Sequence, residues 1–177
     1  MAYPTENLRS TLSEARRPDG RTDEAQKRLS SVLIVENDQD VLHTLMTDLG
    51  SQFSLVETAA DSDAADALLS RCHFDLIISA IRLPGRSGLE WISQLRDLDY
   101  QVPVIFITAH ADKHTAITAV RAGASDFQLK PFNMQQMRTA VTRCIERQRL
   151  KREKVLLRRR GAQRYEGSGF VGSCDLI

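Results

Sequence analysis

The sequence predicts an α/β protein with a doubly wound, five-stranded parallel sheet and an extended C-terminal helix. Three observations favour this fold. From Ser31 to about Val141, short β-branched runs alternate with stretches whose apolar residues recur at helical spacing. The first run, at 32–35, is continuously apolar, which is typical of a strand buried on both faces of a parallel sheet. Strict alternation of strands and helices then gives crossovers that cover both faces of the sheet.

The elements follow one another without long gaps. The expected strands are 32–35, 53–56, 75–80, 102–108 and 126–129. Pro103 lacks a backbone N–H, so it should lie near the start of the fourth strand. The first expected helix has Val41, Leu42, Leu45, Met46 and Leu49 on one face, and the third carries Leu89, Trp91, Ile92, Leu95 and Leu98. The second spans 64–71, the fourth spans 112–122, and the fifth runs from 133 onwards. Gly50 and Gly123 are positioned to end the first and fourth helices.

Charge divides the chain of 177 residues into unlike parts, although 24 Lys and Arg nearly balance 23 Asp and Glu. Residues 31–142 have a net charge of −6, and residues 143–177 have a net charge of +6. The length allows one domain with appendages. We interpret 1–30 as a mobile N-terminal arm, 31–142 as the domain and 143–165 as a basic helical extension or linker. Residues 166–177 form a tail.

Several classes of protein are excluded by composition. No apolar run approaches the roughly 18–20 residues of a membrane span, and the first thirty residues lack the apolar core of a secretory signal. The three cysteines are widely spaced and form no CxxC pair, so neither a disulfide framework nor a zinc site is indicated. We therefore expect a cytoplasmic protein with no membrane partner. The strand ends carry no glycine-rich phosphate loop and no Ser/His or Cys/His constellation, so we expect no enzyme.

The functional site of a doubly wound sheet lies beyond the carboxyl ends of its strands. Four segments that contain these ends resemble the receiver domain of bacterial two-component response regulators. They are VLIVENDQDVL at 32–42, DLIISAIRLPGRSGLEWI at 75–92, PVIFITAHAD at 103–112 and GASDFQLKPF at 123–132. The resemblance implies the flavodoxin-like receiver fold and a role in phosphorelay signal transduction and transcription regulation.

The resemblance also implies where the site residues lie. In that family, an acidic pair after the first strand holds Mg²⁺, an Asp at the end of the third strand accepts a phosphoryl group, and a Ser or Thr and a Lys contact that group. Thr108 and Lys130 fit the hydroxyl and ammonium positions. Phe127 matches the aromatic residue whose rotation accompanies switching.

Two positions depart from the family pattern. Ala80 stands where the family has the phosphoacceptor Asp, and alanine offers no nucleophile. The acidic pair reads Glu36-Asn37, so the pocket loses two of its three usual carboxylates. We expect a degenerate pocket in which Mg²⁺ is not required and binds weakly or not at all. Asp38 and Ser79 should point away from the pocket, because adjacent residues of an extended segment face opposite sides.

Ala80 allows two interpretations. The domain is a natural pseudo-receiver, which Asn37 favours as a second change, or it carries a deliberate Asp-to-Ala change in an otherwise phosphorylatable receiver. A pseudo-receiver would act through protein–protein interaction or dimerisation. Its output surface would be the fourth helix, fifth strand and fifth helix. Its partners would be a histidine kinase or another signalling protein.

The C-terminal extension is the third informative region. Met134, Met137, Val141, Cys144 and Ile145 recur on one helical face, and 143–164 contains ten Lys and Arg but only two acids. We expect this helix to pack against a second copy or an output domain, or to act as a solvated linker. Nucleic-acid binding by the basic helix is an alternative, disfavoured because no helix-turn-helix pattern or aromatic stacking residue accompanies it. The closing GFVGSCDLI resembles the first turn of the ATPase module of sigma-54-dependent activators, and the segments AHAD and GASDFQLKPF resemble the receivers of that group more than others. We therefore expect either a regulatory fragment with a covalently linked output domain or a natural orphan that has lost its output.

Overall fold

A computed structural model describes residues 30–110 and 112–166. The expected arm, except Ser30, and the expected tail, except Glu166, lie outside the described residues. Ser30 is buried, and its carbonyl oxygen accepts hydrogen bonds from the backbone N–H and the hydroxyl of Ser54 at 3.0 and 2.9 Å. This residue of the expected arm therefore packs with the folded domain.

The predicted five-stranded parallel sheet is confirmed. Its strands are β1 (Ser31–Val35), β2 (Leu55–Ala59), β3 (Leu76–Ala80), β4 (Val104–Thr108) and β5 (Asp126–Leu129). They pair in the order β2-β1-β3-β4-β5, and every pair is parallel. Strand β3 is therefore central, and its carboxyl end lies between those of β1 and β4.

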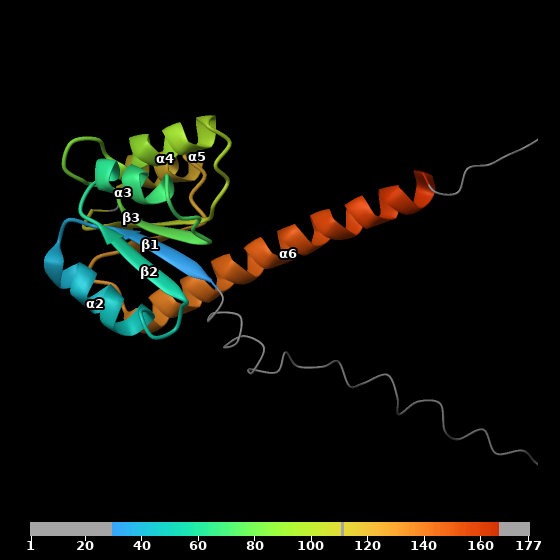
Figure 1. Cartoon of the computed structure of the whole chain (residues 1–177). Coiled ribbons are helices and arrows are strands. Elements are labelled where there is room, and N and C mark those ends of the chain that lie inside the picture. Colours follow the sequence, from blue (N-terminus) through green and yellow to red (C-terminus); the bar gives the residue numbers. More distant parts are fainter. Residues whose placement is uncertain (1–29, 111, 167–177) are drawn as a thin grey trace, which may run out of the picture.

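Helices cover both faces of this sheet. They are α2 (Gln39–Leu49), α3 (Ser62–Leu69), α4 (Gly88–Asp97), α5 (Lys113–Arg121) and α6 (Met134–Glu166). Helices α2 and α6 lie on one face, and α3, α4 and α5 lie on the other (Figure 1). Helix α6 continues far past the sheet (Figure 1). Among the described residues, no helix is both long and apolar enough to cross a membrane.

The strands alternate their side chains between two cores. Val32 and Ile34 pack with Met137 on the α2/α6 face, whereas Leu33 and Trp91 belong to the opposite core. The face of α6 that the sequence predicted as apolar is buried from Met137 to Ile145. An ion pair between Arg138 of α6 and Asp48 of α2 joins the two helices of this layer.

The second strand begins two residues later than predicted, at Leu55 instead of Phe53. Phe53 is buried, but it fills the core from the turn that precedes the strand. Strand β2 lies at the sheet edge and is only half-buried over most of its length, and it continues through polar Glu57 and Thr58. Phe53 therefore marked a core contact and not the start of the strand.

Polar caps fix where the helices begin. Asp38, Asp61, Ser87 and Asp112 cap α2, α3, α4 and α5, and α3 starts two residues earlier than predicted. The N–H of Thr115 donates to the Asp112 carboxylate, which holds the pKa of that carboxyl below its ordinary value. Gly123, with φ of +79°, follows α5 in the left-handed conformation that glycine tolerates best.

Candidate functional site

Four of the residues predicted for the site meet at the carboxyl edge of the sheet. Glu36 directly follows β1, Ala80 ends β3, Thr108 ends β4 and Lys130 directly follows β5. The sheet's hydrogen bonding continues to this edge, because the N–H of Lys130 donates to the carbonyl of Thr108 at 2.7 Å. Phe127 lies within β5 and packs, half-buried, against the core under α3, α4 and α5.

An ion pair occupies the centre of this edge. The Lys130 ammonium nitrogen lies 2.6 Å from Oε2 of Glu36, whose side chain is 1% exposed. The other carboxylate oxygen of Glu36 accepts the N–H of Asp38 at 3.0 Å. Both oxygens of Glu36 are therefore engaged. The Glu36 carboxylate is shielded from water, whereas the Lys130 side chain is 21% exposed, so removing Lys130 leaves a buried charge uncompensated.

Ala80 presents only a methyl group at the end of the central strand. It is 3% exposed and packs with the core under α2 and α6. Ser79, which is fully buried, belongs to the opposite face and donates its hydroxyl to the Ala80 carbonyl at 3.0 Å. Helix α4 presses on the same carbonyl, since a Cβ on Gly88 would lie 2.0 Å from that oxygen. This strand end is tightly enclosed and carries no nucleophilic side chain.

The residues after β1 do not make a fitting Mg²⁺ site. Asn37 is exposed, and Oδ1 of Asp38 caps α2 by accepting the N–H groups of Asp40 and Val41 at 3.0 and 3.3 Å. Glu36 is paired with Lys130. Over residues 30–110 and 112–166, no group of three or more His, Cys, Asp or Glu residues could hold a metal ion. Mg²⁺ needs near-octahedral oxygen ligands, and this donor set supplies too few free carboxylates.

The hydroxyl of Thr108 is engaged within its own loop. It donates to the carbonyl of His110 at 3.1 Å and accepts the N–H of His110 at 3.3 Å. Thr108 is buried, whereas His110 is exposed. The local turn therefore uses the hydroxyl that the sequence suggested for a phosphoryl contact.

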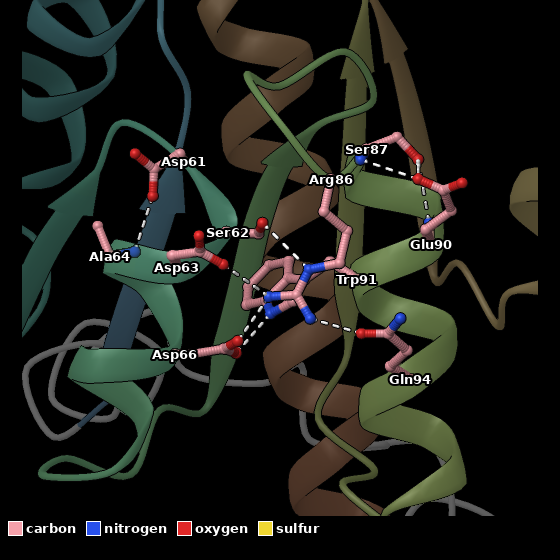
Figure 2. A network of polar contacts seen from close by, with 10 residues as sticks. All are labelled: Asp61, Ser62, Asp63, Ala64, Asp66, Arg86, Ser87, Glu90, Trp91 and Gln94. Carbon is pink, nitrogen blue, oxygen red and sulfur yellow. Dashed lines mark hydrogen bonds and ion pairs between the residues drawn. The ribbon is translucent and has the colours of Figure 1, made fainter.

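Sequence reasoning missed a polar network that holds the loop after β3, shown in Figure 2. The Arg86 guanidinium lies 2.6 Å from the Asp66 carboxylate and 3.3 Å from that of Asp63, both on α3. It also donates to Gln94 of α4. The indole N–H of Trp91 donates to Asp66 at 2.7 Å, so one carboxylate joins the loop, α3 and α4. In the sequence, Arg86 shortly precedes the third predicted helix, and nothing in the local pattern indicates its partners on α3.

Comparison with known proteins supports the fold described above. Residues 32–142 match the family model of the response regulator receiver domain. The C4-dicarboxylate transport transcriptional regulatory protein DctD of Pseudomonas aeruginosa is 34% identical over 140 residues, covering 79% of this chain and 30% of the relative. The regulatory protein AtoC of Escherichia coli is 30% identical over 125 residues, covering 71% of this chain and 27% of the relative.

A solved structure extends the comparison. The crystal structure of NtrX from Brucella abortus matches with a TM-score of 0.69 and 29% identity, over 82% of this chain and 32% of that one. The homologues thus include sigma-54 activators. The chain spans less than a third of the length of the two curated relatives.

Proposed function

This chain belongs to the response regulator receiver domain family, and on that premise we propose a receiver that transmits its signal without accepting a phosphoryl group at residue 80. It would act in two-component signalling and transcription regulation. The observation that carries the proposal is the pairing of Lys130 with Glu36 beside a strand end that offers only the Ala80 methyl group. The deeper assignment as a natural pseudo-receiver rests on Asn37 as a second departure from the family pattern.

Phosphoryl transfer to a side chain needs a nucleophile and a counter-charge for the transferred oxygens. Position 80 has no nucleophile. The carboxylate that could help to hold a metal is neutralised by Lys130, and the next one is committed to capping α2. The ammonium that would contact a phosphoryl group already has an anionic partner. Each part of the reaction is therefore missing or engaged elsewhere.

A different interaction must then shift the receiver between its two conformations. A phosphoryl group adds about two negative charges to a receiver. Inverting a population of 1:99 takes about 5.5 kcal/mol of differential binding, which a protein interface can supply. The candidate partners are a histidine kinase or another signalling protein, a covalently linked output domain and a second copy of the chain.

Helix α6 offers a surface for the second copy. Leu150 and Leu157 are 56% and 60% exposed, and they lie seven residues apart on the same side of the helix. Large apolar side chains with this spacing favour the pairing of two helices. The helix position between the two leucines that would also face the partner is polar, so we expect the two helices to bind each other weakly. We expect a concentration-dependent dimer in sedimentation experiments that Leu157→Glu weakens. The equivalent change Leu98→Glu, at an exposed position after α4, should not weaken it. A wild-type monomer at every concentration would remove this part of the proposal.

Incubation with acetyl phosphate and Mg²⁺, read by intact mass, tests the phosphorylation claim. We expect no adduct on the wild type and none on Ala80→Asp, because the metal donor set stays short. The double change Ala80→Asp with Asn37→Asp should gain an acid-labile phosphoryl adduct. Its control is Ala80→Asn with Asn37→Asp, which keeps the shape of the side chain but has no carboxylate.

The other outcomes separate the alternatives. A stoichiometric, acid-labile adduct on the wild type would overturn the proposal. Full phosphorylation of Ala80→Asp alone would instead favour a receiver in which only the acceptor was changed. Circular dichroism of each variant shows whether the substituted strand end still folds.

A further inference from the structure

A hollow lies at the amino end of the sheet, opposite the candidate site. It has a volume of about 330 Å³ and lies between the end of α5, the segment before β4 and the middle of α6. Four cationic side chains line it: Arg96, Arg121, Arg147 and Lys151. Ser125 and Gln148 add neutral hydrogen-bonding groups. No Asp or Glu is among its lining residues in the described part of the chain.

Three of these cations have no anionic partner among residues 30–110 and 112–166. Arg121, Arg147 and Lys151 form no ion pair with any residue that the structure describes. The two acids of this part of α6 line other hollows, Glu146 beside Arg143 and Glu153 on the side of Asp75. The charged residues that α6 contributes to this cavity, Arg147 and Lys151, are therefore all cationic.

The fourth cation is partly buried, and within the part of the chain that the structure describes it also has no carboxylate partner. Arg96 donates to the backbone carbonyls of Tyr100, Val102 and Gly123 at 2.5, 2.7 and 3.4 Å. Burial lowers the pKa of this guanidinium, because removal from water disfavours the charged form. Carbonyl oxygens satisfy its N–H groups but do not neutralise its charge.

Neighbouring groups do little to balance the cations. Burial, helped by the charge of Asp126, raises the pKa of the Cys144 thiol to about 11, so Cys144 adds no negative charge to the cavity at neutral pH. Asp126 does not line the cavity, and its carboxylate accepts the N–H of Phe127 at 2.8 Å. Four like charges around one small space repel each other and concentrate a positive potential there.

We propose that this cavity binds a small ligand that carries two or more phosphate groups. Several cations around one hollow match a multiply charged anion, and arginine forks bind phosphate oxygens in pairs. The volume lies at the lower end of the range for small-molecule sites, which favours a compact ligand. Because the lining comes from both α5 and α6, the ligand would also fix the start of the extension against the domain. The inference does not depend on whether residue 80 can be phosphorylated.

Titration calorimetry with inorganic pyrophosphate and inorganic triphosphate tests the site on the full chain. We expect one molecule bound per chain, with triphosphate bound more tightly than pyrophosphate. Arg147→Gln and Lys151→Gln should each weaken binding about tenfold or more, as expected for the loss of a charge-assisted hydrogen bond. The matched control is Arg149→Gln, which removes the same charge from α6 but lines a different hollow. It should change the affinity by less than about twofold, since screening by salt weakens distant charges.

Three results would overturn the proposal. The first is no binding of either polyphosphate, and the second is an equal loss of affinity in Arg149→Gln, which would indicate general attraction to a basic helix. The third is a DNA duplex that binds more tightly than triphosphate and is weakened equally by all three changes, which would assign the cations to nucleic acid. Ligand-free melting temperatures guard against misfolding. They should stay level or rise in Arg147→Gln and Lys151→Gln, because each change relieves repulsion.

Discussion

The two ends of the parallel sheet differ in whether their charged side chains are paired. At the carboxyl end, Lys130 and Glu36 form a shielded pair beside an uncharged Ala80. At the amino end, four cations surround a hollow that no carboxylate lines within the described residues. At the carboxyl end, which family resemblance marks as functional, the charges of Lys130 and Glu36 neutralise each other. At the amino end the positive charges are not neutralised, so an anionic ligand should bind there.

Breaking the ion pair should have the largest effect on stability. Lys130→Met leaves Glu36 buried without a counter-ion, and we expect a loss of about 3–5 kcal/mol in the free energy of unfolding, measured with urea. The control Lys113→Met, at the exposed start of α5, should cost less than about 0.5 kcal/mol. Adding Glu36→Leu to Lys130→Met should recover much of the loss. Equal stabilities of the two lysine variants would show that the pair contributes nothing.

Arg96→Lys should have the next largest effect and should act at the amino end. One ammonium group cannot reach all three carbonyl oxygens that the guanidinium now bridges, so we expect a loss of about 1–3 kcal/mol. The same urea experiment measures it. An unchanged stability would mean that the carbonyl contacts do not hold the loops around the cavity.

The dependence of stability on salt should distinguish the two ends of the sheet. Screening relieves repulsion among exposed like charges but acts much less on a buried pair. The unfolding free energy of the wild type should therefore rise between low and moderate salt, and Arg147→Gln should reduce that rise while changing stability by less than about 0.5 kcal/mol. If salt destabilises the wild type as much as it destabilises Arg147→Gln, the cations at the amino end do not repel one another.

The last effect is absent at neutral pH and develops only in alkali. The thiol of Cys144 has its pKa raised by burial from 9.0 to about 11, so between these values the unfolded chain binds fewer protons than the folded one. Stability from this group is complete below about pH 9 and is lost as pH rises towards 11. Urea unfolding across that range should show a steeper decline in the wild type than in Cys144→Ala. Superimposed profiles would contradict the assignment.

Much of the fold could be predicted because buried parallel strands leave a strong signal. The run at 32–35 is apolar throughout, and it lies within β1, between β2 and β3. Strand β2 was misplaced because an edge strand with Glu57 and Thr58 lacks that signal, while Phe53 supplies a false one from the turn. The start of α3 was predicted two residues late because the capping role of Asp61 was not used.

The site was predictable in position but not in its contacts. Residues at strand ends meet whatever their identity, so Glu36, Ala80 and Lys130 could be placed together. Which oxygen Lys130 reaches depends on side-chain conformations between strands that are not neighbours in the sheet. The cationic cavity unites Arg96, before β4, with residues of α6, and only the packing of the helices brings them together. The sequence predicted a basic extension but not the face that its cations share.

A single pair of amide-shift titrations in a ¹H–¹⁵N correlation experiment tests the contrast between the two ends most directly. We expect inorganic triphosphate to shift the amides around Gly123, Ser125 and Arg147, and beryllofluoride with Mg²⁺ to leave those of Ala80, Thr108 and Lys130 in place. Shifts at Ala80 and Lys130 on adding beryllofluoride and Mg²⁺, with none around Gly123 on adding triphosphate, would contradict it.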